Sequence, residues 1–144
     1  MKQRLTTAPI LGHPDFSKPF IVMTDASKNG LGAILTQKDE FNREVVIRYA
    51  SRATTGTERN YAATQLEQLG VVWAVKYFRK YLLGQPFQIY TDHQAITRLM
   101  STKEPTGITA RWIMILQEYK PFEVIYRPGK NHSNVDTLSR TLYQ

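Results

Sequence analysis

The feature that most constrains the fold is the order of the segments with strand and helix character. Three strand-like segments follow one another near the start of the chain, and Asn29-Gly30 between the first two is a typical hairpin turn. Short turns between consecutive strands imply an antiparallel meander. Further along, helical and strand-like segments alternate, which implies crossovers and parallel strands. The predicted strands are Phe20–Asp25, Leu31–Gln37, Val45–Ser51, Phe87–Asp92 and Phe122–Tyr126.

The predicted helices complete an α/β domain with a mixed five-stranded sheet and helices on both of its faces. The longest begins at Thr57, a candidate N-cap, and runs to about Leu83 before Gly84. Three shorter helices are predicted over 94–100, 109–119 and 135–142. In the second of these, apolar side chains at positions 112, 115, 116 and 119 share one face, which we expect to pack on the long helix.

Size and composition indicate one globular domain. The chain has 144 residues, of which 42% are apolar and 22% charged, and we expect residues 9–142 to form the domain and residues 1–8 to be a linker or tail. The absence of cysteine excludes disulfide scaffolds, thiolate nucleophiles and Cys-ligated metal sites. No apolar run reaches the roughly 20 residues of a membrane span. We therefore expect no membrane partner and an intracellular protein, cytoplasmic or, as an alternative, nuclear.

The charge balance favours a polyanionic partner. Nineteen Lys and Arg against twelve Asp and Glu give a formal net charge of +7. Binding of such a surface to phosphates releases counterions, which drives association with nucleic acid. The alternative is that the charge serves only solubility.

Four carboxylates lie at positions where a charged side chain indicates a functional role. Asp25 and Asp92 end strands, and Asp136 opens the last predicted helix. Because the carboxyl ends of parallel strands meet at one edge of a sheet, these side chains can gather there. Glu67 lies inside the long helix on the same stripe as Gly70, and small residues on that stripe allow the helix to approach the sheet closely.

Gathered carboxylates repel one another and need a cation. Asp and Glu oxygens with no Cys or His ligand nearby suit Mg²⁺, with Mn²⁺ as a substitute. Two such ions about 3.5–4 Å apart can clamp the attacking and leaving oxygens of a phosphodiester. The alternative is that the acids reach strand ends by chance and that Asp136 only caps a helix.

Several motifs together resemble one known family. TDASKNGLGAILTQ, YASR, TERNY, TDHQAITRL, RWIMILQEY and YRPGKNHSNVDTLSR follow one another as in the RNase H domain of reverse transcriptases from gypsy-type LTR retrotransposons. The resemblance runs from Leu5 to Arg140. It implies the RNase H fold, hydrolysis of the RNA strand of RNA–DNA hybrids during reverse transcription, and a polymerase region of the same polyprotein as partner. We expect the isolated domain to be a monomer.

The resemblance also implies residue roles. It makes the four carboxylates Asp25, Glu67, Asp92 and Asp136 the catalytic residues and the ligands of two Mg²⁺ ions, in a mechanism that leaves 5′-phosphate and 3′-hydroxyl ends. The residues next to the catalytic aspartates would contact the hybrid. The predicted substrate contacts are Ala26, Ser27, His93, Gln94, Tyr126 and His132.

Two departures from cellular relatives affect the interpretation. Tyr126 stands where a loop histidine is usual, with His132 nearby, and between Met100 and Thr109 there is no room for an additional basic helix that grips the hybrid. One alternative function is a catalytically silent RNase H-like connection or nucleic-acid-binding module. Another is an integrase-type strand transferase. The presence of all four carboxylates favours the nuclease over the silent module, and the TDAS, TDHQ and VDTLSR contexts argue against the transferase.

Overall fold

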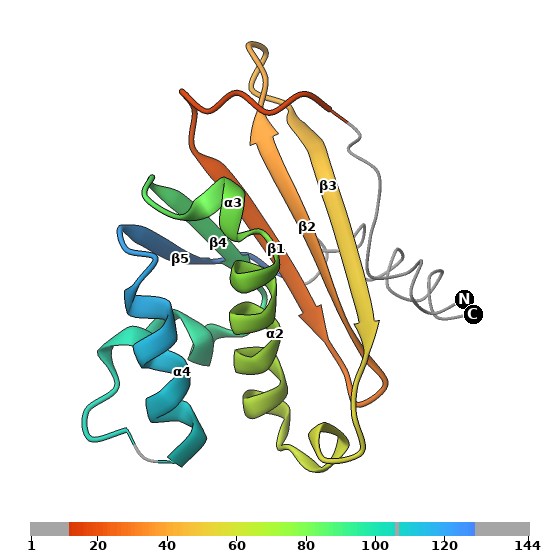
Figure 1. Cartoon of the computed structure of the whole chain (residues 1–144), viewed down its shortest axis with the longest axis vertical. Coiled ribbons are helices and arrows are strands. Elements are labelled where there is room, and N and C mark those ends of the chain that lie inside the picture. Colours follow the sequence, from red (N-terminus) through yellow and green to blue (C-terminus); the bar gives the residue numbers. More distant parts are fainter. Residues whose placement is uncertain (1–11, 106, 129–144) are drawn as a thin grey trace.

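A five-stranded sheet forms the centre of the molecule (Figure 1). The computed structural model describes residues 12–105 and 107–128. The strand order is β3-β2-β1-β4-β5. The predicted mixed five-stranded sheet is therefore confirmed. The strands are β1 (Phe20–Ala26), β2 (Gly30–Lys38), β3 (Glu44–Ala53), β4 (Phe87–Thr91) and β5 (Phe122–Tyr126).

The pairing of the strands follows from how they are connected. β1, β2 and β3 are joined by short turns and pair antiparallel. β4 pairs parallel with β1, and β5 pairs parallel with β4, because helical segments return the chain between them. The carboxyl ends of β1, β4 and β5 consequently lie at the same edge of the sheet.

The helical region after β3 differs from the prediction of one long helix starting at Thr57. It consists of the 3₁₀ helix η1 (Glu58–Asn60), the α-helix α2 (Ala63–Tyr77) and the short helix α3 (Arg79–Leu82). Thr57 makes no side-chain cap, and the residue before α2 is Ala62 in an extended conformation. A single non-helical residue, the fully buried Phe78, separates α2 from α3.

Side-chain contacts explain why the chain is not helical between η1 and α2. The Glu58 carboxylate accepts two hydrogen bonds from the Arg52 guanidinium, at 2.8 and 2.9 Å. The Tyr61 ring packs edge-on against Trp112 of the helix α4 (Gly107–Gln117), with 6.0 Å between ring centroids. These contacts hold residues 58–61 outside the axis of α2. The helix then begins where Gln65 Oε1 accepts a hydrogen bond from the Ala62 N–H at 3.1 Å.

Two of the three predicted shorter helices occur where they were predicted, with one change of type. The segment Gln94–Ser101 is the 3₁₀ helix η2. α4 begins two residues before the predicted helix, and its predicted apolar face is largely buried, at Trp112, Leu116 and the following Tyr119. The helix predicted over 135–142 lies outside the described residues. None of the described helices has the length and apolar character needed to cross a membrane.

The larger core lies between the sheet and the helices. α2 lies along β1, and α4 lies beside α2 (Figure 1). Side chains from α2, α3, α4 and η2 all join this cluster, together with one face of the sheet. The other face carries a smaller cluster of Ile21, Met23 and Ile34. α2 is thus covered by β1 on one side and α4 on the other, as its sequence pattern predicts.

α2 approaches β1 closely at Gly70. A Cβ atom added at Gly70 would lie 3.5 Å from the Cβ of Ala26, which is ordinary van der Waals contact. A methyl group therefore fits between helix and strand, and we expect a larger side chain to press against Ala26. The close approach predicted from the stripe of small residues is confirmed at this position.

The packing at Gly70 predicts opposite effects of two substitutions. Gly70→Ala should stabilise the protein by up to about 1 kcal/mol, because alanine favours the helix and its methyl group fits. Gly70→Leu should destabilise it by about 1–3 kcal/mol, because the side chain would push α2 away from β1. Urea unfolding of both variants measures the difference. Equal stability of the two variants would contradict the close approach.

Candidate functional site

Two of the predicted carboxylates meet because β1 and β4 are parallel neighbours. The register pairs Met23 of β1 with Tyr90 of β4. Continuing this register by two residues brings Asp25, near the end of β1, level with Asp92, which directly follows β4. Asp25 is half-buried, and the Asp92 side chain is 28% exposed. Both carboxylates thus remain within reach of solvent at the same edge of the sheet.

The third carboxylate comes from α2. Glu67 is only 4% exposed and lies one turn before Gly70, so the close approach of α2 carries it to the end of β1. The backbone N–H of Ala26 donates a hydrogen bond to its carboxylate. The structure therefore brings together Asp25, Glu67 and Asp92. Asp136, the fourth predicted carboxylate, lies outside the described residues.

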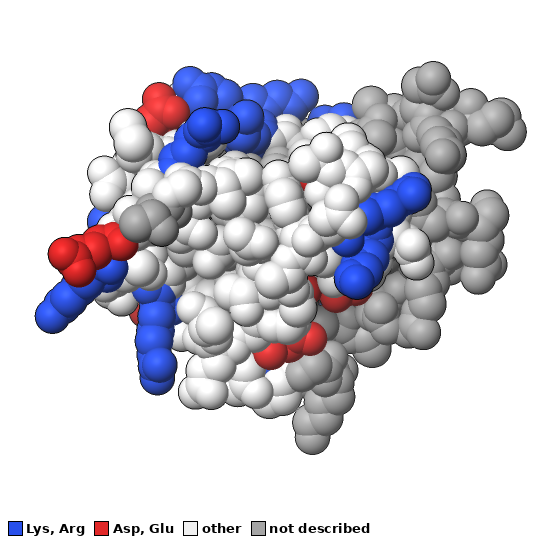
Figure 2. All heavy atoms as spheres, turned by 90° about the horizontal axis from the view of Figure 1, so that it is seen from below, with Lys and Arg blue, Asp and Glu red and all other residues white. Residues whose placement is uncertain are grey.

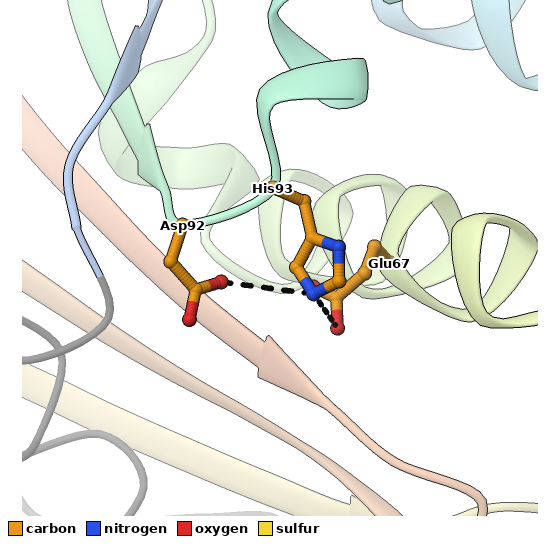
Figure 3. A group of neighbouring side chains, drawn as sticks. All are labelled: Glu67, Asp92 and His93. Carbon is orange, nitrogen blue, oxygen red and sulfur yellow. Dashed lines mark ion pairs between the residues drawn. The ribbon is translucent and has the colours of Figure 1, made fainter.

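His93 lies between Glu67 and Asp92 (Figure 3). Its Nε2 atom is 3.3 Å from Oε2 of Glu67 and 3.8 Å from Oδ1 of Asp92. The backbone N–H of His93 donates a hydrogen bond to Thr91 Oγ1 at 3.1 Å, which fixes the turn after β4. One ligand atom from each of Glu67, Asp92 and His93 lies within 4.8 Å of the others. Together these three side chains can hold a metal ion.

The electrostatics of the site follow from this crowding. Burial, then the negative charge of Asp25 and that of Asp92, raise the pKa of Glu67 to about 8. The hydrogen bond from Ala26 acts in the opposite direction but is outweighed. A divalent cation would offset both the burial and the repulsion, so carboxylate oxygens in this arrangement fit a hard metal ion.

The predicted substrate contacts near Asp25 have a structural task as well. Ser27 Oγ accepts hydrogen bonds from the N–H groups of Asn29 and Gly30, at 3.2 and 3.3 Å, and so closes the turn between β1 and β2. Ala26 lies against Gly70 and donates to Glu67. Both residues therefore shape the end of β1, whether or not they also contact a ligand.

Two further predicted contacts, Gln94 and Tyr126, lie at the same edge of the sheet. Gln94 is exposed at the start of η2. Tyr126, at the end of β5, is 45% exposed and pairs with Thr91, next to Asp92. His132 lies outside the described residues. Figure 2 views the molecule from this end and shows Lys and Arg side chains in several separate groups, with Asp and Glu between them.

Sequence reasoning did not foresee that His93 would lie between the carboxylates. It singled out His93 only as a neighbour of Asp92, and no periodicity indicates where a side chain in a turn points. It also passed over Arg127, whose backbone N–H donates to the Thr91 carbonyl at 2.7 Å. The Arg127 guanidinium lies over the Tyr90 ring, 4.6 Å from its centroid. Arg127, which directly follows β5, thus helps to position the end of β4.

Comparison with solved structures identifies the fold. A foamy viral protease–reverse transcriptase in complex with double-stranded DNA superposes with a TM-score of 0.64 at 24% identity, covering 81% of this chain and 25% of that chain. LC11-RNase H1 in complex with an RNA/DNA hybrid superposes with a TM-score of 0.64 at 17% identity, covering 85% of this chain and 94% of that chain. At these identities the likeness establishes the RNase H fold alone.

Comparison of sequences identifies the family. The chain is 43% identical over 140 residues to the retrovirus-related Pol polyprotein from transposon 297 of Drosophila melanogaster, covering 97% of this chain and 13% of that protein. It is 38% identical over 144 residues to the transposon Tf2-3 polyprotein of Schizosaccharomyces pombe, covering 97% of this chain and 11% of that protein. Residues 15–119 match the model of the RNase H-like domain found in reverse transcriptase. The chain belongs to this family of reverse-transcriptase RNase H-like domains.

Proposed function

We propose that the chain is a metal-dependent endonuclease that hydrolyses the RNA strand of RNA–DNA hybrids during reverse transcription of a gypsy-type LTR retrotransposon. The single observation that carries the proposal is the burial of Glu67 beside Asp25 and Asp92. In a domain with only a structural role, three neighbouring carboxylates would destabilise the fold through burial and mutual repulsion without any benefit. A nuclease needs such a group to hold the cations that act on a phosphodiester.

The proposed ions are two Mg²⁺, with Mn²⁺ as a substitute. Asp25 would be shared by both ions, Glu67 and Asp92 would complete one coordination sphere, and Asp136 would complete the other. When bound, the ions supply Lewis-acid polarisation of the scissile phosphate and activation of the attacking water. In this assignment the Ala26 N–H orients Glu67, and the Thr91 hydroxyl fixes the turn that carries Asp92.

The choice of substrate rests on the family and on charge. LC11-RNase H1 and a foamy viral protease–reverse transcriptase have each been solved with an RNA/DNA hybrid. The net charge of +7 suits a polyanion of this kind. Gln94 and Tyr126 are exposed beside the carboxylates and are the proposed substrate contacts, together with Ala26, Ser27 and His93. His132 keeps its predicted role as a further contact near the fourth carboxylate.

The proposed partner is the polymerase region of the same polyprotein. The chain spans only 11–14% of the length of the retrotransposon polyproteins it matches, so other regions accompany it in those relatives. We propose that the polymerase region makes many of the contacts that bind the hybrid. Without it, the chain should bind hybrid weakly.

The function is tested by incubating the chain with a labelled RNA–DNA hybrid beside RNA–RNA and DNA–DNA duplexes of the same sequence. Cleavage of the RNA strand in the hybrid alone is the expected result. Binding of the hybrid without cleavage, in both Mg²⁺ and Mn²⁺, would favour the catalytically silent module instead. Cleavage of all three duplexes would contradict the proposed specificity.

Asp25→Asn tests the assignment of the metal ligands. Cleavage should fall by about a hundredfold or more, because an amide is a poor ligand for a hard cation. Binding of the hybrid should persist or improve, because a charge that repels phosphate has been removed. Asp39→Asn is the matched control, since Asp39 lies in the turn between β2 and β3, at the other end of the sheet. Cleavage that survives in Asp25→Asn would show that another group holds the ion.

The metal requirement gives a second test of the site. Chelation with EDTA should abolish cleavage, and Mg²⁺ or Mn²⁺ should restore it. Ca²⁺ should bind without supporting turnover, because its larger and more flexible coordination does not hold the reacting oxygens in line. Rapid cleavage in Ca²⁺ alone would contradict a tight two-ion arrangement. The measurement is the initial cleavage rate at equal concentrations of each cation.

The raised pKa of Glu67 predicts how stability depends on pH without metal. The folded state keeps the Glu67 proton up to about pH 8, whereas the unfolded chain releases it near the ordinary value of 4.5. The folded state therefore binds more protons between these values, and the free energy of unfolding should fall as pH rises through this window. The expected loss due to Glu67 is about 2–4 kcal/mol.

Thermal unfolding of the metal-free chain between pH 5 and 8.5 measures this loss. Glu67→Gln is the control, because glutamine keeps the shape of the side chain and does not titrate. The difference between the two proteins should shrink on addition of Mg²⁺ at pH 8.5, since the cation stabilises the ionised carboxylate. An identical pH dependence of the two proteins would mean that the pKa of Glu67 is not raised in the folded state.

A further inference from the structure

We propose that Glu67, Asp92 and His93 form a mixed nitrogen–oxygen site for a borderline transition-metal ion such as Zn²⁺, and that Zn²⁺ bound there inhibits the Mg²⁺-dependent reaction. The binding itself depends only on the three side chains. The inhibition rests on the proposed nuclease function.

The distances between the ligand atoms suit a small tetrahedral ion. Zn²⁺ lies about 2.0–2.1 Å from imidazole nitrogen and carboxylate oxygen, so two ligands of a tetrahedral site lie roughly 3.3–3.4 Å apart. His93 Nε2 is 3.3 Å from Glu67 Oε2. His93 Nε2 is 3.8 Å from Asp92 Oδ1, and one ligand atom of each of the three residues lies within 4.8 Å of the others. The His93–Glu67 pair thus already has the tetrahedral separation, and the Asp92 carboxylate must move closer to complete the site.

The surroundings hold these ligands in place and leave a path for the ion. Glu67 is buried on α2, and the turn carrying Asp92 and His93 is fixed by the hydrogen bond to Thr91 Oγ1. The His93 side chain is 42% exposed, so an ion can enter from solvent on that side (Figure 3). The negative charges of Asp25 and Asp92 attract a divalent cation to the same point.

The imidazole is what separates this site from the proposed Mg²⁺ site. Mg²⁺ prefers oxygen ligands and gains little from a histidine. Zn²⁺ binds imidazole well, whereas Mg²⁺ and Mn²⁺ are better suited to carboxylate and water ligands. Both ions would use Glu67 and Asp92, so they compete. Only Zn²⁺ would also use His93.

Calorimetric titration of the metal-free 144-residue chain with Zn²⁺ at constant pH tests the binding. His93→Gln should weaken Zn²⁺ binding by about tenfold or more, as expected for loss of a ligand. The same variant should change Mg²⁺ affinity by less than about threefold. His13→Gln is the matched control, because it removes a histidine at the opposite end of the sheet, beside Gln37. Circular dichroism verifies that each variant folds.

Several outcomes would overturn the proposal. Unchanged Zn²⁺ affinity in His93→Gln would make His93 only a hydrogen-bond partner of Glu67. A loss of affinity in His132→Gln in place of His93→Gln would assign the ion to another group. Zinc must also shift the His93 Nε2 resonance in a ¹H–¹⁵N spectrum at stoichiometric concentration, and an unchanged resonance would exclude direct ligation.

The inhibition is tested separately from the binding. In Mg²⁺, the Zn²⁺ concentration that halves cleavage should be at least about tenfold higher for His93→Gln than for the unchanged chain, each relative to its own rate. Zinc binding through His93 without any cleavage in Mg²⁺ would contradict the proposed function and leave the zinc site standing. Cleavage with no effect of His93→Gln on zinc inhibition would contradict this proposal and leave the nuclease standing.

Discussion

The burial of Glu67 against the end of β1 is the constraint on which the site depends. α2 is held between β1 and α4, so the carboxylate cannot turn away into solvent. Asp25 and Asp92 add negative charge on the side that remains open. The hydrogen bond from the Ala26 N–H compensates only in part, since the pKa of Glu67 stays well above its ordinary value. Packing thus holds carboxylates together at an unfavourable electrostatic free energy, which a bound cation can offset. The main hydrophobic core of the domain keeps them in this arrangement.

The same constraint explains small residues that carry no chemistry. Gly70 is one turn beyond Glu67 and meets Ala26, the residue after Asp25. Side chains larger than a methyl group at this contact would separate helix and strand, and with them Glu67 and Asp25. The parallel pairing of β1 and β4 supplies the remaining geometry, because a shift of one residue in that register would turn Asp92 to the opposite face of the sheet. The distance between carboxylates is therefore set by backbone packing and not by loops.

The sequence allowed the sheet to be predicted better than the helices around it. Alternating apolar residues bounded by turns fixed β5 to its observed limits and β1 to within one residue. The start of α2 was predicted wrongly, because the Arg52–Glu58 pair and the contact of Tyr61 with Trp112 are tertiary interactions between distant residues. Within the site, three carboxylates could be foreseen from strand ends and helix spacing. The position of the His93 imidazole could not, since it depends on one side-chain rotamer in a turn.

The distribution of positive charge bears on how the proposed nuclease would select its cleavage site. On the face seen in Figure 2, the Lys and Arg side chains of the described residues form separate groups, and residues 102–106 connect η2 to α4. A long hybrid held by scattered cations has no fixed register relative to Asp25, Glu67 and Asp92. The carboxylates and their proposed ions would then hold one phosphate, and we expect the direction and register of the duplex to come from contacts other than these described cations. On this account the proposed chemistry belongs to the domain, and we expect the polymerase region proposed as its partner to determine which phosphate is cleaved.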